Sequence, residues 1–277
     1  MPLHLTQQQI DQFHNAGYVA PIDIMPEQTA LEYAQKLVAA EKKYPGALEG
    51  RNRNNAHLVF RFLDEIALHE TILDIVQDLI GPNLLLWGCV LFIKEPESKG
   101  YVSWHQDATY MGLQPQNFVT PWVALSPSDE ESGCMSVIPG SHLDGIRTHQ
   151  DTFEENNLLT RGQNITDINE DEAVNLILRP GQASCHHGKI IHGSRPNRSG
   201  HRRIGVAIQA FITPESKQTV SNISHAILAR GEDRFGHHTL IPRPTMDMSQ
   251  ESQALRDAVN ANWANILYKD AGQSRNY

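Results

Sequence analysis

Two side chains in the stretch YVSWHQDATYMGL, residues 101–113, have the types and spacing that suit metal binding. His105 and Asp107 lie two positions apart in a segment that reads as a β-strand, so both are expected to point to the same face. A further histidine, His192, ends another apolar segment. Two histidines and one carboxylate form the facial triad that holds non-haem Fe(II) and leaves coordination positions open for a bidentate co-substrate and O₂. We therefore predict an Fe(II) site at these three residues.

A candidate anion-binding group follows the second histidine. Arg203 lies eleven residues after His192, at the start of the next apolar segment, and Arg202 precedes it. A guanidinium can donate two parallel hydrogen bonds to a carboxylate, which a lysine ammonium cannot. An arginine that points into a barrel therefore indicates an anionic ligand, such as a dicarboxylic co-substrate. The sequence leaves open which arginine faces inward, and the other is expected to be a solvated cation at the strand end.

The chain has 14 histidines, so other candidate ligands must be weighed. His186 precedes His192 by six positions and shares its face in a strand, so we expect it to line the same pocket. His187 would point the other way. Our choice for the third ligand remains His192.

Helices are expected in the first part of the chain, about residues 1–82. Residues 6–18 begin with Thr6 followed by Gln9, a capping-box pattern, and Gly17 suits the helix end. Two further segments have apolar residues at helical spacing. These segments are residues 26–46 and 67–83.

From residue 84 the pattern changes to short apolar segments bounded by turn residues, which predicts a β-sandwich or barrel. We expect the barrel core to span about residues 84–214. A polar, acidic segment, residues 144–172, interrupts the strands and is predicted to be an insertion that acts as a lid. Residues 252–267 are expected to form a C-terminal helix. The segments expected to hold strands are 84–96, 120–127, 134–142, 173–181, 183–193 and 202–214.

Composition narrows the classes of function. The chain has 277 residues, enough for one large domain or two small ones, and we predict a single domain over residues 1–277. The net charge of -9 argues against binding to nucleic acid or to an anionic membrane. No apolar stretch is long enough to span a membrane. Three cysteines without regular spacing argue against a disulfide framework and favour a cytoplasmic location.

Three motifs resemble those of the phytanoyl-CoA dioxygenase family of Fe(II)- and 2-oxoglutarate-dependent oxygenases. They are WHQDATY, GCMSVIPGSH and HGSRPNRSGHRRIGVAI, and the resemblance runs from about residue 6 to about residue 214. It implies a mainly β fold with flanking helices, namely a double-stranded β-helix (jelly roll, cupin-like). It also implies Fe(II), 2-oxoglutarate and O₂ as cofactor and co-substrates, with His105, Asp107 and His192 as the iron ligands.

The same resemblance implies roles for residues around the metal. Arg203 would pair with the distal carboxylate of 2-oxoglutarate, and Ser194 would assist with its hydroxyl group. Trp122 would lie beside the co-substrate, although ordinary core packing explains it equally well. His57 aligns with a polar co-substrate contact only if a gap is allowed. Lys94 matches a lysine common in the family, and either a site contact or an edge lysine whose ammonium reaches solvent would account for it.

The implied reaction is hydroxylation of a substrate C–H bond. Related halogenases lack the carboxylate ligand, so the presence of Asp107 argues against halogenation. Two alternatives remain. A cupin-type Zn or Ni isomerase or hydrolase could use the same triad, but Arg203 would then have no purpose. The second alternative is a non-catalytic binding member of the fold. Such members often lack one of the metal ligands, and none is missing here.

The expected substrate is a small polar metabolite. The acidic chain has no evident cluster for the phosphates of coenzyme A, which argues against phytanoyl-CoA. An aminophosphonate such as 2-aminoethylphosphonate is one candidate, and Arg51 and Arg53 in RNRNN could receive its anionic group, although a solvated loop explains them as well. The sequence leaves the oligomeric state open.

Overall fold

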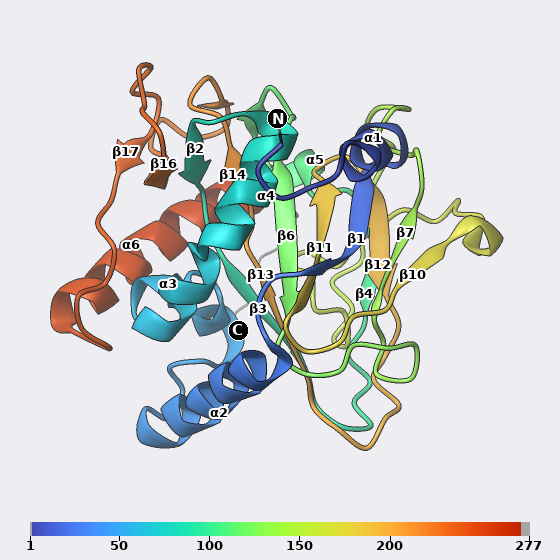
Figure 1. Ribbon diagram of the computed structural model, residues 1–277, viewed down its shortest axis with the longest axis horizontal. Coiled ribbons are helices and arrows are strands. Elements are labelled where there is room, and N and C mark those ends of the chain that lie inside the picture. Colours follow the sequence, from blue (N-terminus) through green and yellow to red (C-terminus); the bar gives the residue numbers. More distant parts are fainter. Residues whose placement is uncertain (1, 273–277) are drawn as a thin grey trace.

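Two β-sheets face each other in the computed structural model, which describes residues 2–272 (Figure 1). Within that range the larger sheet has nine strands, with β1, β11, β6, β14, β2, β16 and β17 in order and with β13 pairing β3 and β6. Its strands are β1 (Tyr18–Asp23), β2 (Leu84–Leu86), β3 (Val90–Lys94), β6 (Val119–Ala124), β11 (Gln182–His187), β13 (Arg203–Ala207), β14 (Phe211–Ile212), β16 (His225–Arg230) and β17 (Thr239–Leu240).

The smaller sheet has four strands in the described part of the chain, in the order β10, β7, β12, β4. Side chains of β1 pack with those of β7, so the two inner faces share an apolar interior. This arrangement is the predicted double-stranded β-helix. The strands are β4 (Val102–His105), β7 (Met135–Ile138), β10 (Val174–Leu176) and β12 (Ile191–Ser194). Two small two-stranded sheets pair β5 (Leu113–Gln114) with β15 (Lys217–Gln218) and β8 (Gln150–Asp151) with β9 (Gln163–Asn164).

Helices cover one side of the larger sheet, as Figure 1 shows. The expected capping box is present in α1, where Thr6 accepts from the Gln9 backbone, and Gly17 ends the helix with φ 83°. The stripe predicted in residues 67–83 is the buried face of α4. The helices are α1 (Gln7–Ala16), α2 (Glu27–Lys43), α3 (Arg61–Ala67), α4 (Glu70–Ile80), α5 (Ala108–Met111) and α6 (Gln250–Leu267), with short 3₁₀ turns η1 (Gly50–Arg53), η2 (Ala56–Leu58) and η3 (Glu170–Glu172).

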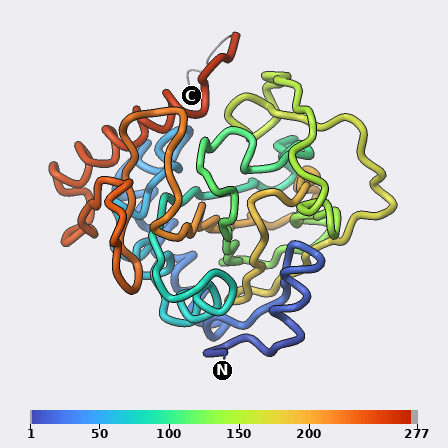
Figure 2. Tube along the Cα trace, turned by 90° about the horizontal axis from the view of Figure 1, so that it is seen from above, coloured from blue at the N-terminus to red at the C-terminus, as the bar shows by residue number. Residues whose placement is uncertain are grey.

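The C-terminal helix α6 lies against the N-terminal segment rather than apart from the barrel. Figure 2 shows it beside the light-blue trace of residues near 50. Asn260 donates a hydrogen bond to the Asn54 carbonyl (3.2 Å) and accepts one from the Asn55 amide (2.9 Å). Segments about 200 residues apart therefore form one wall of the molecule.

The prediction of a purely helical N-terminal part was wrong at β1. This strand pairs antiparallel with β11 and adds an edge to the larger sheet. Pro21 lies in it, and proline in a strand normally signals an edge position, which weakened the strand pattern in the sequence. The larger sheet also extends past residue 214, because β16 pairs with β2.

The cysteines and helices agree with two expectations from composition. Cys89, Cys134 and Cys185 are buried and none forms a disulfide. None of the helices in residues 2–272 has the length and apolarity needed to cross a membrane.

Gly205 allows one close contact that shapes the barrel interior. A Cβ atom at this position would lie 1.8 Å from Cζ2 of Trp122, so only glycine leaves room for the indole. We expect Gly205→Ala to displace Trp122 and to lower the free energy of unfolding by about 1–3 kcal/mol, as overpacking does. Urea unfolding measures the change. Gly200→Ala is the control because no atom lies within 4 Å of its added Cβ, and equal stability of the two variants would contradict the prediction.

Candidate functional site

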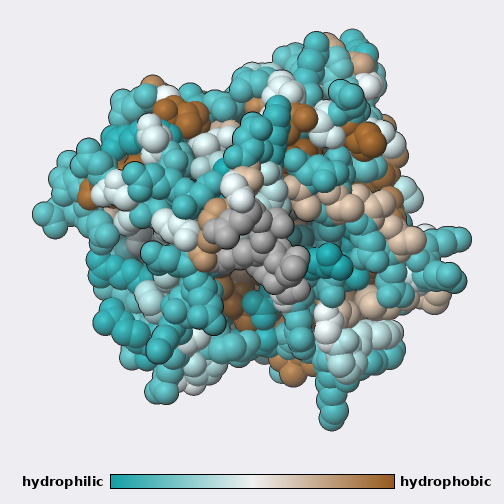
Figure 3. Space-filling view, turned by 180° about the vertical axis from the view of Figure 1, so that it is seen from behind, coloured by the Kyte–Doolittle hydropathy of each residue, from teal (hydrophilic) through white to brown (hydrophobic). Residues whose placement is uncertain are grey.

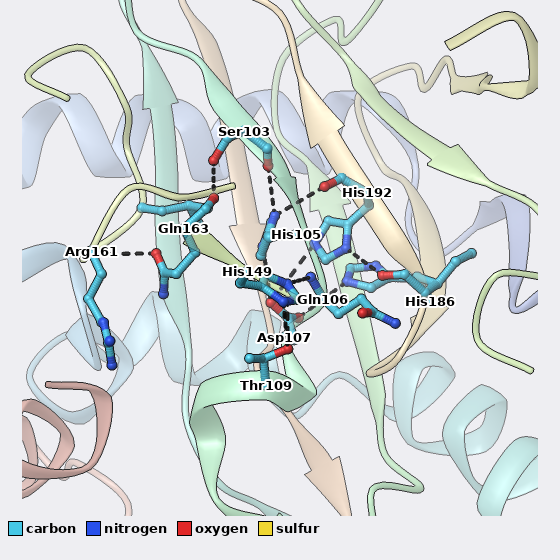
Figure 4. A network of polar contacts seen from close by, with 12 residues as sticks. Ser103, His105, Gln106, Asp107, Thr109, His149, Arg161, Gln163, His186 and His192 are labelled. Atoms are coloured by element: carbon cyan, nitrogen blue, oxygen red, sulfur yellow. Dashed lines mark hydrogen bonds and ion pairs between the residues drawn. The ribbon is translucent and has the colours of Figure 1, made fainter. Parts of the chain in front are cut away.

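The three predicted metal ligands meet inside the barrel, as Figure 4 shows. His105 Nε2 lies 3.3 Å from Asp107 Oδ1, and His192 Nε2 lies 3.9 Å from the same oxygen. The candidate ligand atoms all lie within 4.8 Å of one another, and all three side chains are buried. This spacing suits a single metal ion.

Hydrogen bonds to the backbone orient both imidazoles. His105 Nδ1 lies 2.9 Å from the Ser103 carbonyl and 3.0 Å from the His192 carbonyl, and His192 Nδ1 lies 3.1 Å from the Ile190 carbonyl. A carbonyl can only accept, so Nδ1 carries the proton in each ring and donates it. Each Nε2 then keeps its lone pair toward Asp107, which is the form that binds a metal.

The strand argument for Asp107 was wrong, although the residue does reach the site. Strand β4 ends at His105, and Asp107 has φ -55° and ψ -41° just before α5. The intervening Gln106 turns its side chain away, as predicted, and its amide donates to the carbonyls of Gly145 (2.8 Å) and Lys189 (2.7 Å). Asp107 therefore reaches the histidines because of a turn that Gln106 fixes, and not because side chains alternate along a strand.

His149 supports the same turn and was not expected from the sequence. Its Nε2 accepts a hydrogen bond from the Gln106 backbone at 2.9 Å, and its Nδ1 lies 2.8 Å from the Arg147 carbonyl (Figure 4). The predicted insertion, residues 144–172, thus contributes to the position of a ligand. No pattern around His149 distinguishes it from a surface histidine.

The local electrostatics favour a charged Asp107 carboxylate beside a neutral His192 imidazole. Burial by itself would raise the pKa of Asp107, but the adjacent imidazoles of His105 and His186 outweigh it and hold the pKa well below its usual range. Burial, followed by the proximity of His105, lowers the pKa of His192 far below its usual value. Such a set binds a divalent cation without first losing a proton.

His186 lines the same pocket, as its spacing from His192 predicted. Its Nε2 lies 3.6 Å from Asp107 Oδ2, and its ring centroid lies 4.7 Å from that of His192. Neither ring nitrogen of His186 nor Asp107 Oδ2 has a hydrogen-bond partner in residues 2–272. An imidazole N–H at this place can donate to the carboxylate oxygen that faces away from His105, and such contacts orient metal ligands.

The structure places Arg203, and not Arg202, in the interior. Arg203 is 2% exposed, its guanidinium carbon lies 4.8 Å from the Trp122 ring centroid, and its Nη1 donates to the Gly133 carbonyl. Its Nε has no hydrogen-bond partner among the described residues. Burial lowers the pKa of Arg203 to about 10, so it stays charged at neutral pH. Arg202 instead pairs with Glu41 (2.7 Å) and Glu95 (2.9 Å).

Lys94 lies behind Ser194 rather than in the cavity. It pairs with Arg203 across β3 and β13, and its Nζ donates to Ser194 Oγ (2.7 Å) and to the carbonyls of Gly133 (3.3 Å) and Arg195. Because the Ser194 oxygen accepts from Lys94, its own hydroxyl proton is free to point at a ligand. Burial, and then Arg203, lower the pKa of Lys94 to about 6.

His57 is not among the residues that line this cavity. It is buried in η2, and burial lowers its pKa to about 3, so it is a neutral interior residue. Its alignment with a co-substrate contact required a gap, and the structure does not bring it to the triad.

One cavity of about 450 Å³ contains the triad together with Trp122, Ser194 and Arg203. Several buried polar atoms on its wall lack partners in residues 2–272, namely Thr120 Oγ1, Arg203 Nε, Asp107 Oδ2 and both ring nitrogens of His186. Such atoms are normally satisfied by a ligand, ion or water. Arg203 is buried without an ion pair in residues 2–272, and it shares the cavity with Asp107 and the histidines. This arrangement fits an anionic co-substrate bound next to a divalent cation.

Part of the insertion forms the roof of this cavity. Leu158, Leu159 and Thr160 lie on the cavity wall, and Ser103 donates a hydrogen bond to the Gln163 carbonyl beneath them. This placement is consistent with the predicted lid.

Comparisons with known proteins agree with the geometry. A family model described as phytanoyl-CoA dioxygenase matches residues 4–205. A "probable alpha-ketoglutarate-dependent hypophosphite dioxygenase" from Stutzerimonas stutzeri is 32% identical over 161 residues, which cover 55% of this chain and 54% of the relative. A phytanoyl-CoA dioxygenase domain-containing protein from Danio rerio is 36% identical over 52% of this chain and 48% of its own length. The chain thus spans about half the length of the curated relatives it matches.

Solved structures share the architecture over most of the chain. A structure described as the non-heme monooxygenase ThoJ in its apo form has a TM-score of 0.78 and 32% identity, and covers 92% of this chain and 98% of its own. A structure of CytC3 with Fe(II) and alpha-ketoglutarate has a TM-score of 0.66 and covers 87% of this chain and 94% of its own; at 22% identity it shares the fold.

Arg203 and Arg202 form a matched pair for a first test of the site. We expect Arg203→Ala to weaken 2-oxoglutarate binding about tenfold to hundredfold, because a charge-assisted bidentate contact is lost. Arg202→Ala should leave this affinity unchanged, since its partners are acidic side chains outside the cavity. Isothermal titration of the Ni(II)-loaded protein measures both. Similar losses in the two variants would contradict the placement of Arg203.

His186 provides a second test, on metal affinity. We expect His186→Phe to weaken Co(II) binding about tenfold or more, because Asp107 loses the donor that orients it. His225→Phe is the control, since its Nδ1 also lacks a partner but its position on β16 is remote from the triad. Equilibrium dialysis with Co(II) measures the dissociation constants. Unchanged affinity in His186→Phe would mean that this histidine only fills space.

Proposed function

We propose, because the chain belongs to the phytanoyl-CoA dioxygenase family, that the protein is an Fe(II)- and 2-oxoglutarate-dependent dioxygenase that hydroxylates a C–H bond of a small metabolite. This proposal rests on one observation. The buried triad lies in the same cavity as Arg203, which has no ion pair in residues 2–272. The jelly-roll fold and the likeness to non-haem 2-oxoglutarate enzymes support the same reaction class.

The residues have separate tasks in this reaction. Nε2 of His105 and His192 and Oδ1 of Asp107 would hold the iron. When bound, Fe(II) with 2-oxoglutarate and O₂ supplies oxidative decarboxylation to succinate and CO₂, coupled to insertion of one oxygen atom into a substrate C–H bond. Arg203 binds the distal carboxylate of the co-substrate, and Ser194 donates its hydroxyl proton to the same group.

Other residues keep the reacting groups in place and water out. Trp122 lies against the Arg203 guanidinium, whose carbon is 4.8 Å from the ring centroid, and limits its movement. His186 restrains the second oxygen of Asp107. Leu158 and Leu159 of the insertion cover the cavity and exclude solvent from the oxidation.

Two features argue against the alternative reaction classes. A Zn or Ni isomerase or hydrolase would leave the buried charge of Arg203 without a partner in the described chain, and an uncompensated buried charge is costly. A non-catalytic member would have no need to retain all three ligands in metal-binding geometry.

The proposed substrate class is a small anion, with 2-aminoethylphosphonate as a candidate. Arg51 is exposed and Arg53 half-buried, and both lie on the cavity wall. Arg53 donates to the carbonyls of Leu48 (3.1 Å) and Ile93 (3.5 Å), and neither arginine has an ion pair within 4.0 Å in residues 2–272. The relative described as acting on hypophosphite supports a phosphorus-containing anion.

Turnover with a substrate panel tests this function. We expect Fe(II) and 2-oxoglutarate to give succinate at a rate that rises when the correct small anion is added, and we would include 2-aminoethylphosphonate in the panel. His105→Ala, Asp107→Ala and His192→Ala should each abolish succinate formation while the protein stays folded, because the site has no spare ligand. Circular dichroism checks the fold, and His225→Ala is the control. Full activity in any triad variant would remove that residue from the metal site.

A further inference from the structure

The cavity continues beyond the triad into an apolar chamber. Its walls include Trp87, Met111, Leu158, Trp263 and Leu267, which come from four separate segments of the chain. We use "apolar chamber" for the part of the cavity lined by these five residues. A pocket usually binds a ligand through apolar walls and places a few polar groups to orient it.

Two tryptophans give the apolar chamber an aromatic wall. The rings of Trp87 and Trp263 are stacked, with centroids 4.4 Å apart and planes inclined by 17°. Trp263 lies so close to Gly88 that a Cβ there would be 2.0 Å from its ring. The Trp87 indole donates to Ser224 Oγ at 3.2 Å, which fixes its orientation. Both rings are therefore held in place before any ligand binds.

The roof of the apolar chamber is fastened to α6. Arg161 of the insertion donates hydrogen bonds to the carbonyls of Leu267 (3.2 Å) and Lys269 (3.1 Å), and it pairs with Asp151. These contacts satisfy carbonyls at the C-terminal end of α6. Leu158 on the roof and Leu267 on the wall are thereby joined, so the chamber has a defined size.

Two arginines line the same cavity as the tryptophans. Arg51 and Arg53 belong to η1, and Asn260 of α6, one turn before Trp263, donates a hydrogen bond to the Arg51 carbonyl at 3.5 Å. A substrate that reaches both groups must combine an anionic end with an apolar body.

Resting on the proposed function, we infer that the substrate is an amphipathic anion whose aromatic or branched aliphatic body occupies the apolar chamber while its charge meets Arg53. A purely polar metabolite such as 2-aminoethylphosphonate would leave the chamber unfilled. The proposed substrates are thus no longer small anions in general but anions that carry an apolar group.

Two phosphonates that differ in their apolar group test the inference. Isothermal titration of the Ni(II)- and 2-oxoglutarate-loaded protein would compare phenylphosphonate with methylphosphonate. We expect phenylphosphonate to bind about thirtyfold more tightly, because its ring leaves water for the apolar chamber. Equal or weaker binding of phenylphosphonate would overturn the inference.

A variant that fills the apolar chamber locates the binding site of the ring. Leu267→Trp should abolish the preference for phenylphosphonate and leave methylphosphonate affinity unchanged. Leu143→Trp is the control, because Leu143 is 67% exposed and does not line the cavity. Leu158→Trp fills the same space from the roof and replaces Leu267→Trp if that variant does not fold. A preference retained in the filled variant would show that the ring binds elsewhere and would overturn the inference.

A second pair of variants tests the charged end. Arg53→Gln should weaken both phosphonates about tenfold, as loss of a charge-assisted hydrogen bond does, and leave benzyl alcohol binding unchanged. Arg61→Gln is the control, because Arg61 is exposed and does not line the cavity. Unchanged phosphonate affinity in Arg53→Gln would contradict the assigned role of this arginine.

Failure of this inference differs from failure of the proposed function. If Ni(II) and 2-oxoglutarate bind but phenylphosphonate shows no advantage, the apolar substrate class is wrong and the oxygenase assignment stands. If neither Ni(II) nor 2-oxoglutarate binds, the proposed function is wrong and the substrate inference falls with it.

Discussion

The antiparallel pairing of β4 with β12 sets the positions of the candidate metal ligands. His192 lies directly opposite His105 in this register, and β12 is held on its other edge by β7. A slip by one residue would turn His192 to the opposite face, because side chains alternate along a strand. Asp107 depends on the same pairing, since it follows the end of β4 and its turn is fixed by Gln106. The geometry of the candidate metal site thus depends on strand register.

The interior of the barrel carries an electrostatic cost that a ligand would relieve. Arg203 is almost fully buried and has no ion pair within residues 2–272; its buried neighbour Lys94 adds little charge at neutral pH, because burial lowers the pKa of Lys94 to about 6. Burial of charge without a counter-charge is unfavourable. Trp122 offers the face of its ring to Arg203, and the Gly133 carbonyl accepts from the guanidinium, but these contacts only partly replace water. An anion bound beside Arg203 supplies the missing charge, so the stability of this region and co-substrate binding are coupled.

The sequence predicted the barrel, the triad and the anion-binding arginine, but not how they are positioned. Residue types and the resemblance identified His105, Asp107 and His192, whereas the turn that carries Asp107 depends on Gln106 contacts to residues about 40 and 80 positions away. The choice between Arg202 and Arg203 required the pairing of β13 with β3, which sequence alone leaves open. Strand β1 was missed because it contains Pro21 and lies between two helices. The stacking of Trp87 on Trp263 joins positions with no local signal.

The residues that line the cavity come from two parts of the sequence, one inside and one outside the range that the family model matches. The triad, Ser194 and Arg203 all fall within residues 4–205, the range that the family model matches. Trp263 and Leu267 lie beyond it, on a helix whose Asn260 donates a hydrogen bond to the Arg51 carbonyl of η1. The residues proposed to bind the metal and the co-substrate therefore lie in the part shared with the family, while α6 lines the same cavity from outside that part. The family match thus leaves the cavity residues of α6 unaccounted for, and the identity of the substrate must be sought partly in the contacts of α6.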